Sequence, residues 1–176
     1  MPRRPKVAHV TTADISLRYL LLDQMRYLVE AGYEVHGISS AGGDVAAVEE
    51  AGVPHTAVSL TRRMTPLTDL RALAQLVWIM RREGYDIVHT HTPKAGLLGQ
   101  VAARLAGVPT VVNTIHGFYF HEGTPATRRS VLVALERLAA LCSDAILMQS
   151  AEDVETALRL RIGRSDIVSF LGNGID

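Results

Sequence analysis

The stretch YDIVHTHTPKAGLLGQVAARLAGVPTVVNTIHGFYFH, residues 85–121, decides the fold of this chain. Its branched apolar run predicts a strand at residues 86–90, and Thr92 followed by Pro93 predicts a helix that begins directly after that strand. A second strand is predicted at residues 110–115. Because two strands joined by a crossover helix run parallel, we expect a parallel sheet.

The helix between these two strands carries small residues along one side. Gly96, Gly99 and Ala103 recur at helical spacing, which lets the helix backbone lie close against a sheet. Gly107 and Pro109 end the helix. We therefore expect this helix to pack tightly on the sheet.

Histidines follow both strands. His89 and His91 lie at the end of the first strand, and His116 follows the second, at the start of the segment HGFYFH (116–121). Because the carboxyl ends of parallel strands meet at the same edge, we expect these side chains at one rim of the sheet. That rim is the usual ligand site of an open parallel sheet.

The rest of the chain alternates between strand and helix patterns. The helices include one capped by Ser16 and one capped by Thr68 or Asp69. The prediction is an α/β fold with a doubly wound, mainly parallel Rossmann-like sheet of about seven strands. In the common strand order the first and fourth strands are neighbours, so a crevice is expected between residues 11–16 and 89–94. Helix N-termini there would favour an anion. Further strands are predicted at residues 6–11, 34–39, 55–60, 143–149 and 166–171.

Length and composition indicate one domain, residues 1–176, because 48% of the 176 residues are apolar and the chain is short for two domains. The formal net charge is zero, so no nucleic-acid partner is expected. The single Cys142 cannot form an internal disulfide, and neither a signal peptide nor an apolar run of about 18 residues is present. We expect a cytoplasmic domain.

Several common sites are excluded by the sequence. The loop at residues 11–16 has no glycine, so the GxGxxG fingerprint of a dinucleotide site is missing. No GxxxxGK[ST] phosphate loop occurs. The segment GISSA at residues 37–41 departs from the GxSxG elbow of serine hydrolases and lies away from the expected crevice.

The histidines leave two interpretations open. His89 and His91 point the same way on a strand and, with His116, are the start of a metal pocket, but no carboxylate completes it and we expect no metal. Otherwise His89 is a buried residue bonded to backbone. His116 is the stronger ligand candidate, because Gly117 turns the chain toward the crevice.

The aromatic segment after His116 also has two uses. Phe118 is expected to fill space under its loop, whereas Tyr119 and Phe120 are expected to form a platform for a sugar or a lipid. Lys94, at a helix N-terminus, is either solvated or holds an anion. Asp14 is an ordinary turn residue or a ligand contact.

These motifs resemble the N-terminal domain of retaining glycosyltransferases of family 4, which have two facing Rossmann-like domains in a GT-B fold. The resemblance rests on KVAHVTT at the start, HTHTPKAG and IHGFYF in the middle, and LGNGID at residues 171–176, which is similar to the family's PNGID junction between domains. The chain looks most like bacterial enzymes that build capsular polysaccharide or exopolysaccharide.

The resemblance implies a hexosyltransferase that uses a nucleotide-sugar donor, expected to be UDP-linked, with no other cofactor. It implies that His116 is catalytic and lies beside the transferred sugar. The other residues expected to bind substrate line the two sides of the crevice and the loop after His116: Thr11, Thr12, Asp14, Ser16, His89, His91, Thr92, Lys94, Gly117, Tyr119 and Phe120.

The sequence departs from the family in three places. Thr12-Ala13-Asp14 replaces a frequent glycine pair, and Gly172 replaces the proline of the junction. The second domain, which in the family binds most of the nucleotide and carries two glutamates seven residues apart, does not follow Asp176. We therefore expect an acceptor-side domain that is inactive alone, since one wall of the cleft is missing.

The expected partners are this C-terminal donor-binding domain and a glycan or lipid-linked acceptor. Contact with the inner face of a membrane is a further hypothesis, motivated by Arg62-Arg63, by Trp78 and by the aromatic residues of segment 116–121. Two other functions stay open: half of a nucleotide-sugar epimerase, which has the same architecture, and a non-catalytic accessory or binding domain.

Overall fold

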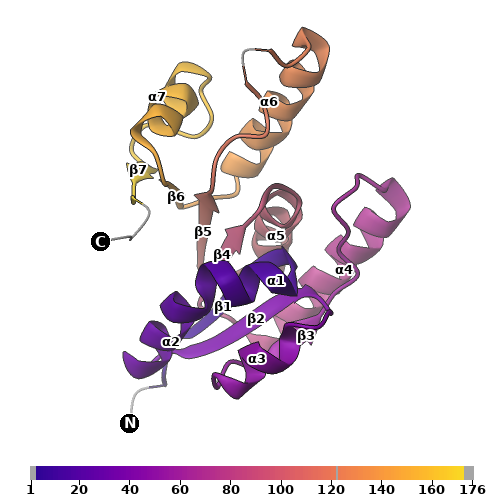
Figure 1. Cartoon of the computed structure of the whole chain (residues 1–176), viewed down its shortest axis with the longest axis vertical. Coiled ribbons are helices and arrows are strands. Elements are labelled where there is room, and N and C mark those ends of the chain that lie inside the picture. Colours follow the sequence, from indigo (N-terminus) through magenta and orange to yellow (C-terminus); the bar gives the residue numbers. More distant parts are fainter. Residues whose placement is uncertain (1–2, 122, 173–176) are drawn as a thin grey trace.

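The computed structural model describes residues 3–121 and 123–172, so the last four residues of the LGNGID segment lie outside it. The chain forms one seven-stranded sheet in the order β3-β2-β1-β4-β5-β6-β7, and every pairing is parallel (Figure 1). This confirms the predicted fold class. The strands are β1 Lys6–Ala13, β2 Glu34–Ser40, β3 His55–Ala57, β4 Ile87–His91, β5 Thr110–Ile115, β6 Ala145–Met148 and β7 Val168–Phe170.

Helices cover both faces of the sheet. The α4 and α5 helices pack together on one face, where α5 lies over Val10 and Thr90. The helical segment after β1 covers the other face, where Leu17 lies next to Gly37 of β2. The helices are α1 Asp14–Ser16, the π-helical turn η1 Leu17–Leu21, α2 Leu22–Glu30, α3 Val45–Glu50, α4 Pro66–Glu83, α5 Pro93–Ala106, α6 Ala126–Ala140 and α7 Ala151–Arg159.

The predicted neighbourhood of the first and fourth strands is confirmed. β1 pairs with β4 so that His9 lies beside His89, and β4 pairs with β5 so that His91 lies beside Thr114. His9 is also in register with Gly37, which places it on the sheet face that the η1 segment covers. The histidines of β1 and β4 therefore share one face.

The small residues of α5 do allow close packing. A Cβ atom at Gly99 would lie 2.7 Å from Cγ2 of Thr90, and one at Gly96 would lie 3.3 Å from Oδ1 of Asn113. Both distances are shorter than an ordinary van der Waals contact. The helix axis can approach β4 and β5 only because these positions have no side chain.

Three predicted boundaries are wrong by three residues or more, and the ends of β1, β6 and β7 differ from the prediction by one or two residues. Ser16 lies inside the first helix rather than capping it, because the helix already begins at Asp14. The third strand ends at Ala57, since Leu60 donates to the carbonyl of Val58 and the chain leaves the ladder. The helix expected to start at Thr68 or Asp69 begins at Pro66, with Asp69 accepting from the Thr65 backbone N–H (2.9 Å).

The core consists of three clusters. The largest lies between the central strands and the α4–α5 pair, and includes Leu76 and Val88. A second lies under η1 and α2, around Leu17 and Met25. The third, around Ile146, joins α6 and α7 to β6 and β7 in the upper part of Figure 1.

Candidate functional site at the carboxyl ends of three strands

His116 lies at the rim with the histidines of the neighbouring strands, as the sequence predicts. Its Nε2 atom is 3.2 Å from Nδ1 of His91, and Nε2 of His91 is 3.2 Å from Nδ1 of His9. His9 and His91 are buried, whereas His116 is half-buried and reaches the surface of a cavity. The two strand ends therefore meet at one edge.

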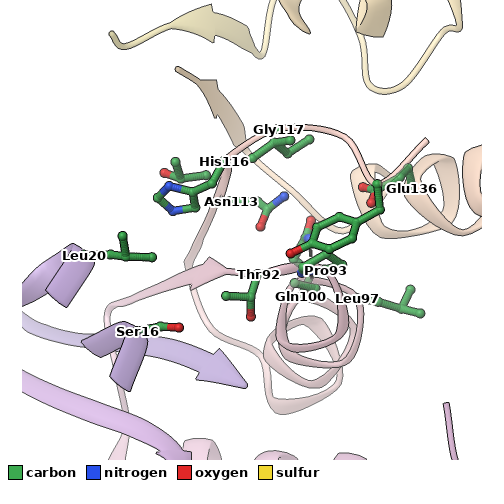
Figure 2. Close-up of a pocket in the computed structure, with 14 residues that line it drawn as sticks. Ser16, Leu20, Thr92, Pro93, Leu97, Gln100, Asn113, His116, Gly117 and Glu136 are labelled. Carbon is green, nitrogen blue, oxygen red and sulfur yellow. Dashed lines mark hydrogen bonds between the residues drawn. The ribbon is translucent and has the colours of Figure 1, made fainter. Parts of the chain in front are cut away.

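The rim opens into a cavity of about 170 Å³ (Figure 2). Its labelled side chains come from α1 and η1, from α5 and the residue before it, from β5 and the loop after it and, on the far side, from α6. The chain's own side chains do not fill this cavity. The lining residues are Ser16, Leu20, Thr92, Pro93, Gly96, Leu97, Gln100, Asn113, Thr114, Ile115, His116, Gly117, Tyr119 and Glu136.

Two threonines join the end of β1 to the residue that follows β4. The Thr12 backbone N–H donates to Oγ1 of Thr92 (3.1 Å), and the two hydroxyls lie 2.9 Å apart. Thr92 has a φ of 61°, in the left-handed region that β-branched residues rarely adopt. The hydrogen bonds with Thr12 hold Thr92 in this conformation just before α5. Thr92 and Ser16 both line the cavity.

Two of the predicted substrate contacts hold the β1 loop together. Oγ1 of Thr11 donates to the carbonyl of Ala13 (2.9 Å), and the Asp14 carboxylate accepts from the backbone N–H of Asp44 (2.8 Å). Both side chains are buried, and neither lines the cavity. Asp14 thus has the structural use that its position in a turn favours.

Lys94 does not offer its charge to an anion. Its ammonium group forms an ion pair with Asp69 of α4 and donates to Thr61 and to the backbone carbonyl of Arg63. The side chain is only 6% exposed. Its charge is paired within the chain because the loop at residues 61–65 folds over the helix N-terminus, although Lys94 lines a groove beside the cavity, and its contact with substrate stays a prediction.

The aromatic segment divides differently from the prediction. Tyr119 is 66% exposed and lines the cavity, as a platform residue should. Phe120 is 7% exposed and packs with Val133 of α6, so its prediction as a platform is wrong. Phe118 stacks on Phe120 with ring centroids 4.8 Å apart and fills space under the loop, as expected.

The histidine cluster differs from the one considered in the sequence. His9, His89 and His91 each offer one ring nitrogen within 4.8 Å of the others, so His9 stands where His116 was considered as a metal ligand. His89 is buried, but its Nε2 pairs with Oγ1 of Thr114 at 2.7 Å rather than with backbone. The signal for His9 was available, since β1 and β4 were expected to be neighbours.

Burial makes these imidazoles weak bases. It lowers the pKa of His9 to about 4, and lowers the pKa values of His89 and His91 well below the ordinary value. The pKa of His116 is also lowered by burial, while the Gln149 side chain acts in the opposite direction. At neutral pH the cluster is uncharged, and each ring has one N–H and one lone pair.

Sequence reasoning missed four polar residues of the cavity, which are Gln100, Asn113, Thr114 and Glu136. Asn113 accepts from Oγ1 of Thr90 (2.8 Å), and Gln100 donates to the carbonyl of Gly96 (2.9 Å). Burial raises the pKa of Glu136 to about 7. Glu136 lies three residues after the buried Val133 and four before the buried Ala140, a spacing that predicts an inward-facing carboxyl group.

A larger groove of about 560 Å³ adjoins the cavity. It runs between the loop at residues 61–65, the start of α5 and the length of α6 from Arg128 to Ala139. Arg62 and Arg128 line it together with apolar side chains. The apolar residues are Met64, Pro93, Leu97, Val131, Leu132, Leu135 and Ala139.

None of the helices described in residues 3–121 and 123–172 has the length and hydropathy of a membrane span.

Known proteins are similar to this chain in sequence. The chain is 32% identical over 174 residues to the UDP-Gal:alpha-D-GlcNAc-diphosphoundecaprenol alpha-1,3-galactosyltransferase of Escherichia coli, covering 97% of this chain and 45% of that protein. It is 25% identical to the capsular polysaccharide biosynthesis glycosyltransferase CapM of Staphylococcus aureus, covering 98% and 44%. The chain thus spans about half the length of these curated relatives.

Solved structures agree on the fold. Anabaena HepE in complex with UDP and glucose superposes with a TM-score of 0.74 at 19% identity, over 98% of this chain and 45% of HepE. A UDP-N-acetylglucosamine 2-epimerase superposes with a TM-score of 0.73 at 13% identity, over 97% of this chain and 49% of the epimerase. The fold is one half of a GT-B architecture.

The sequence profile of the glycosyl transferase 4-like domain matches residues 18–174, nearly the whole chain. This stretch contains α5, the cavity at the ends of β4 and β5, and the half-buried His116. The chain therefore belongs to the glycosyl transferase 4-like domain family.

Proposed function

We propose that this chain is the N-terminal, acceptor-side domain of a retaining glycosyltransferase that moves a hexose from a UDP-linked donor to a lipid-linked glycan. The observation that carries the proposal is the open cavity at the strand ends, with His116, Tyr119 and Glu136 in its wall, in a chain of this family. Donor and acceptor would meet there once a second domain closes the other side. The chain alone would then bind substrate weakly and transfer no sugar.

His116 is proposed to contact the transferred sugar. It is half-buried, and its lowered pKa keeps the ring neutral, so it can donate one hydrogen bond to a hydroxyl or phosphate oxygen without a charge. Gly117 has a φ of 110°, which only glycine adopts readily, and it turns the chain so that Tyr119 reaches the cavity. Ser16 and Thr92 also line the cavity, and Thr12 lines the adjoining groove.

The groove beside the cavity is proposed to hold the acceptor. Its apolar wall suits the first isoprenoid units of a lipid, and Arg62 and Arg128 suit a diphosphate. A galactosyltransferase relative acts, by its name, on a diphosphoundecaprenol-linked sugar. Tyr119 and Glu136 line both the groove and the cavity, so an acceptor sugar held between them would lie near His116.

The same side of the molecule is proposed to touch the membrane in which such a lipid resides. Leu67 and Leu70, near the start of α4, are 87% and 65% exposed, and Val131 of α6 is 60% exposed. Figure 1 shows the N-terminal ends of α4 and α6 on one side of the molecule. Arg62 and Arg63 are exposed next to them. Exposed apolar side chains beside arginines favour binding to an anionic bilayer surface.

Sedimentation with anionic vesicles tests this contact. Replacing Leu67 and Leu70 by serine should reduce vesicle binding at low salt. Replacing Leu141, which is 82% exposed at the other end of α6, should leave it unchanged. Equal binding by both variants would show that this surface has no such role.

The product of the full-length protein tests the transfer itself. With UDP-sugars and a polyprenyl-diphosphate acceptor, we expect a new glycosidic bond whose anomeric configuration is that of the donor. Structural neighbours also include UDP-N-acetylglucosamine 2-epimerases, so epimerised donor without acceptor elongation would replace the proposal by that function.

A further inference from the structure

Three histidine rings form a line that runs from the centre of the sheet to the cavity. His9 lies on β1, His91 at the end of β4 and His116 just after β5, and the two gaps between nearest nitrogens are both 3.2 Å. The ring centroids are 5.4 Å and 5.5 Å apart, so neighbouring rings meet through their edges rather than stacking face to face. This is the geometry of consecutive N–H···N hydrogen bonds.

Each neutral ring contributes one N–H and one lone pair to this line. The protons can therefore be ordered in only two ways. In the first, Nδ1 of His9 donates to Nε2 of His91, and Nδ1 of His91 donates to Nε2 of His116. In the second, all donors are reversed, and Nε2 of every ring carries the proton.

The inner end of the line distinguishes these two orders. Within residues 3–121 and 123–172, Nε2 of His9 is buried and has no hydrogen-bond partner. The second order would place an N–H on that atom, and orphaned buried N–H groups are rare in proteins. The first order leaves only a lone pair there. It also leaves Nδ1 of His116 as the ring nitrogen that carries a proton outside the line.

We propose that His9 and His91 are positioning residues that hold His116 in the tautomer with its proton on Nδ1. His116 would then present a hydrogen-bond donor, and not an acceptor, to an oxygen in the cavity. That use in sugar transfer rests on the proposed function, whereas the order of protons among the three rings does not.

His89 supports the line from the side without belonging to it. Its ring centroid is 4.1 Å from that of His91, and its Nε2 pairs with Oγ1 of Thr114. Its side chain is buried, as are those of His9 and His91. His89 is therefore a matched control: it shares the packing of the cluster but none of the two N···N contacts.

Nuclear magnetic resonance of the chain with ¹⁵N-labelled histidine tests the proposal without requiring enzyme activity. Ring nitrogen shifts report which nitrogen carries the proton, and scalar coupling across a hydrogen bond reports each N–H···N contact directly. We expect protonated Nδ1 in His9, His91 and His116, and two couplings, at neutral pH. Protonated Nε2 in His91 and His116, or the absence of both couplings, would overturn the proposal.

Two variants separate positioning from packing. His9→Phe keeps a ring but removes the donor to His91, so the His116 shifts should move toward a mixture of tautomers. His89→Phe should leave the His91–His116 coupling and the His116 tautomer in place. Equal changes in both variants would mean that packing alone orients His116. If His9→Phe fails to fold, the couplings in the unsubstituted chain still decide.

Zinc provides the competing outcome, because His9, His89 and His91 together meet the distance requirement for a metal group. We expect the chelator-treated chain to keep both couplings and to be unaffected by added Zn²⁺. Stoichiometric Zn²⁺ binding that abolishes the couplings would show that these rings are ligands and would overturn the hydrogen-bonded line. Neither result depends on sugar transfer, so a failure here leaves the proposed function separately testable.

Discussion

The carboxyl group of Glu136 is half-buried in the wall of the cavity. Burial raises its pKa from 4.5 in the unfolded chain to about 7. Between these values the folded chain holds a proton that the unfolded chain has lost, so stability falls as the pH rises from about 4.5 to about 7.

The substitution Glu136→Gln removes this penalty. Above pH 7 the variant should be more stable than the unsubstituted chain by about 1 kcal/mol, a value reduced for partial exposure, and below pH 4.5 the two should match. Urea unfolding at pH 8 and pH 4 measures the difference. Equal stability at both pH values would show that the carboxyl group is well solvated.

At the scale of elements, Lys94 joins the N-terminus of α5 to α4 through Asp69. Lys94→Met leaves the carboxylate without its partner and should cost roughly 3 kcal/mol of unfolding free energy. The double variant Lys94→Met, Asp69→Leu should recover most of that loss, because no charge is then stranded. A single variant as stable as the parent would show that the ion pair contributes little.

The contact between α5 and β4 allows a second test. Gly99→Ala brings a methyl group to 2.7 Å from Cγ2 of Thr90, so the helix must shift. We expect a loss of about 1–3 kcal/mol, as in other overpacked interiors. Gly43→Ala is the control, since nothing lies within 4 Å of its added Cβ, and its stability should change by less than about 0.5 kcal/mol. Thermal unfolding that ranks the two variants the other way would contradict the packing.

These element-level features show what sequence can predict. The parallel order, the glycine strip of α5 and the meeting of His91 with His116 follow from local patterns, because strand direction and helical spacing are properties of short segments. The role of Lys94 did not follow, since the loop at residues 61–65 that covers it is distant in sequence. Phe120 and Glu136 were misjudged or missed because burial depends on how α6 packs against the sheet.

At the scale of the whole molecule, the buried histidines make the free energy of unfolding depend on pH. The folded pKa of His9, about 4, lies below its unfolded value of 6.5, so the unfolded chain binds a proton first as the pH falls. His89 and His91 are shifted in the same direction. Stability should be fully present above pH 6.5 and decrease toward about pH 4, by about 3 kcal/mol from His9 alone.

Denaturant titrations across this pH range measure the slope. The variant His9→Phe should lose stability less steeply with acid, because one of the protonated groups is absent from its unfolded state. If His9→Phe keeps the parental slope, protonation of His9 does not contribute to the pH dependence of stability.

The central claim is that the mouth at the ends of β4 and β5 is the place of sugar transfer, and His116 is the residue most directly concerned. The decisive measurement is the transfer rate of the full-length protein, with a UDP-sugar and a polyprenyl-diphosphate acceptor, for His116→Ala and for His121→Ala. Both histidines belong to the loop after β5, but His121 is exposed and outside the cavity lining. The account predicts a loss of roughly a hundredfold or more in kcat for His116→Ala and little change for His121→Ala. Equal rates in the two variants, with both folded, would contradict it.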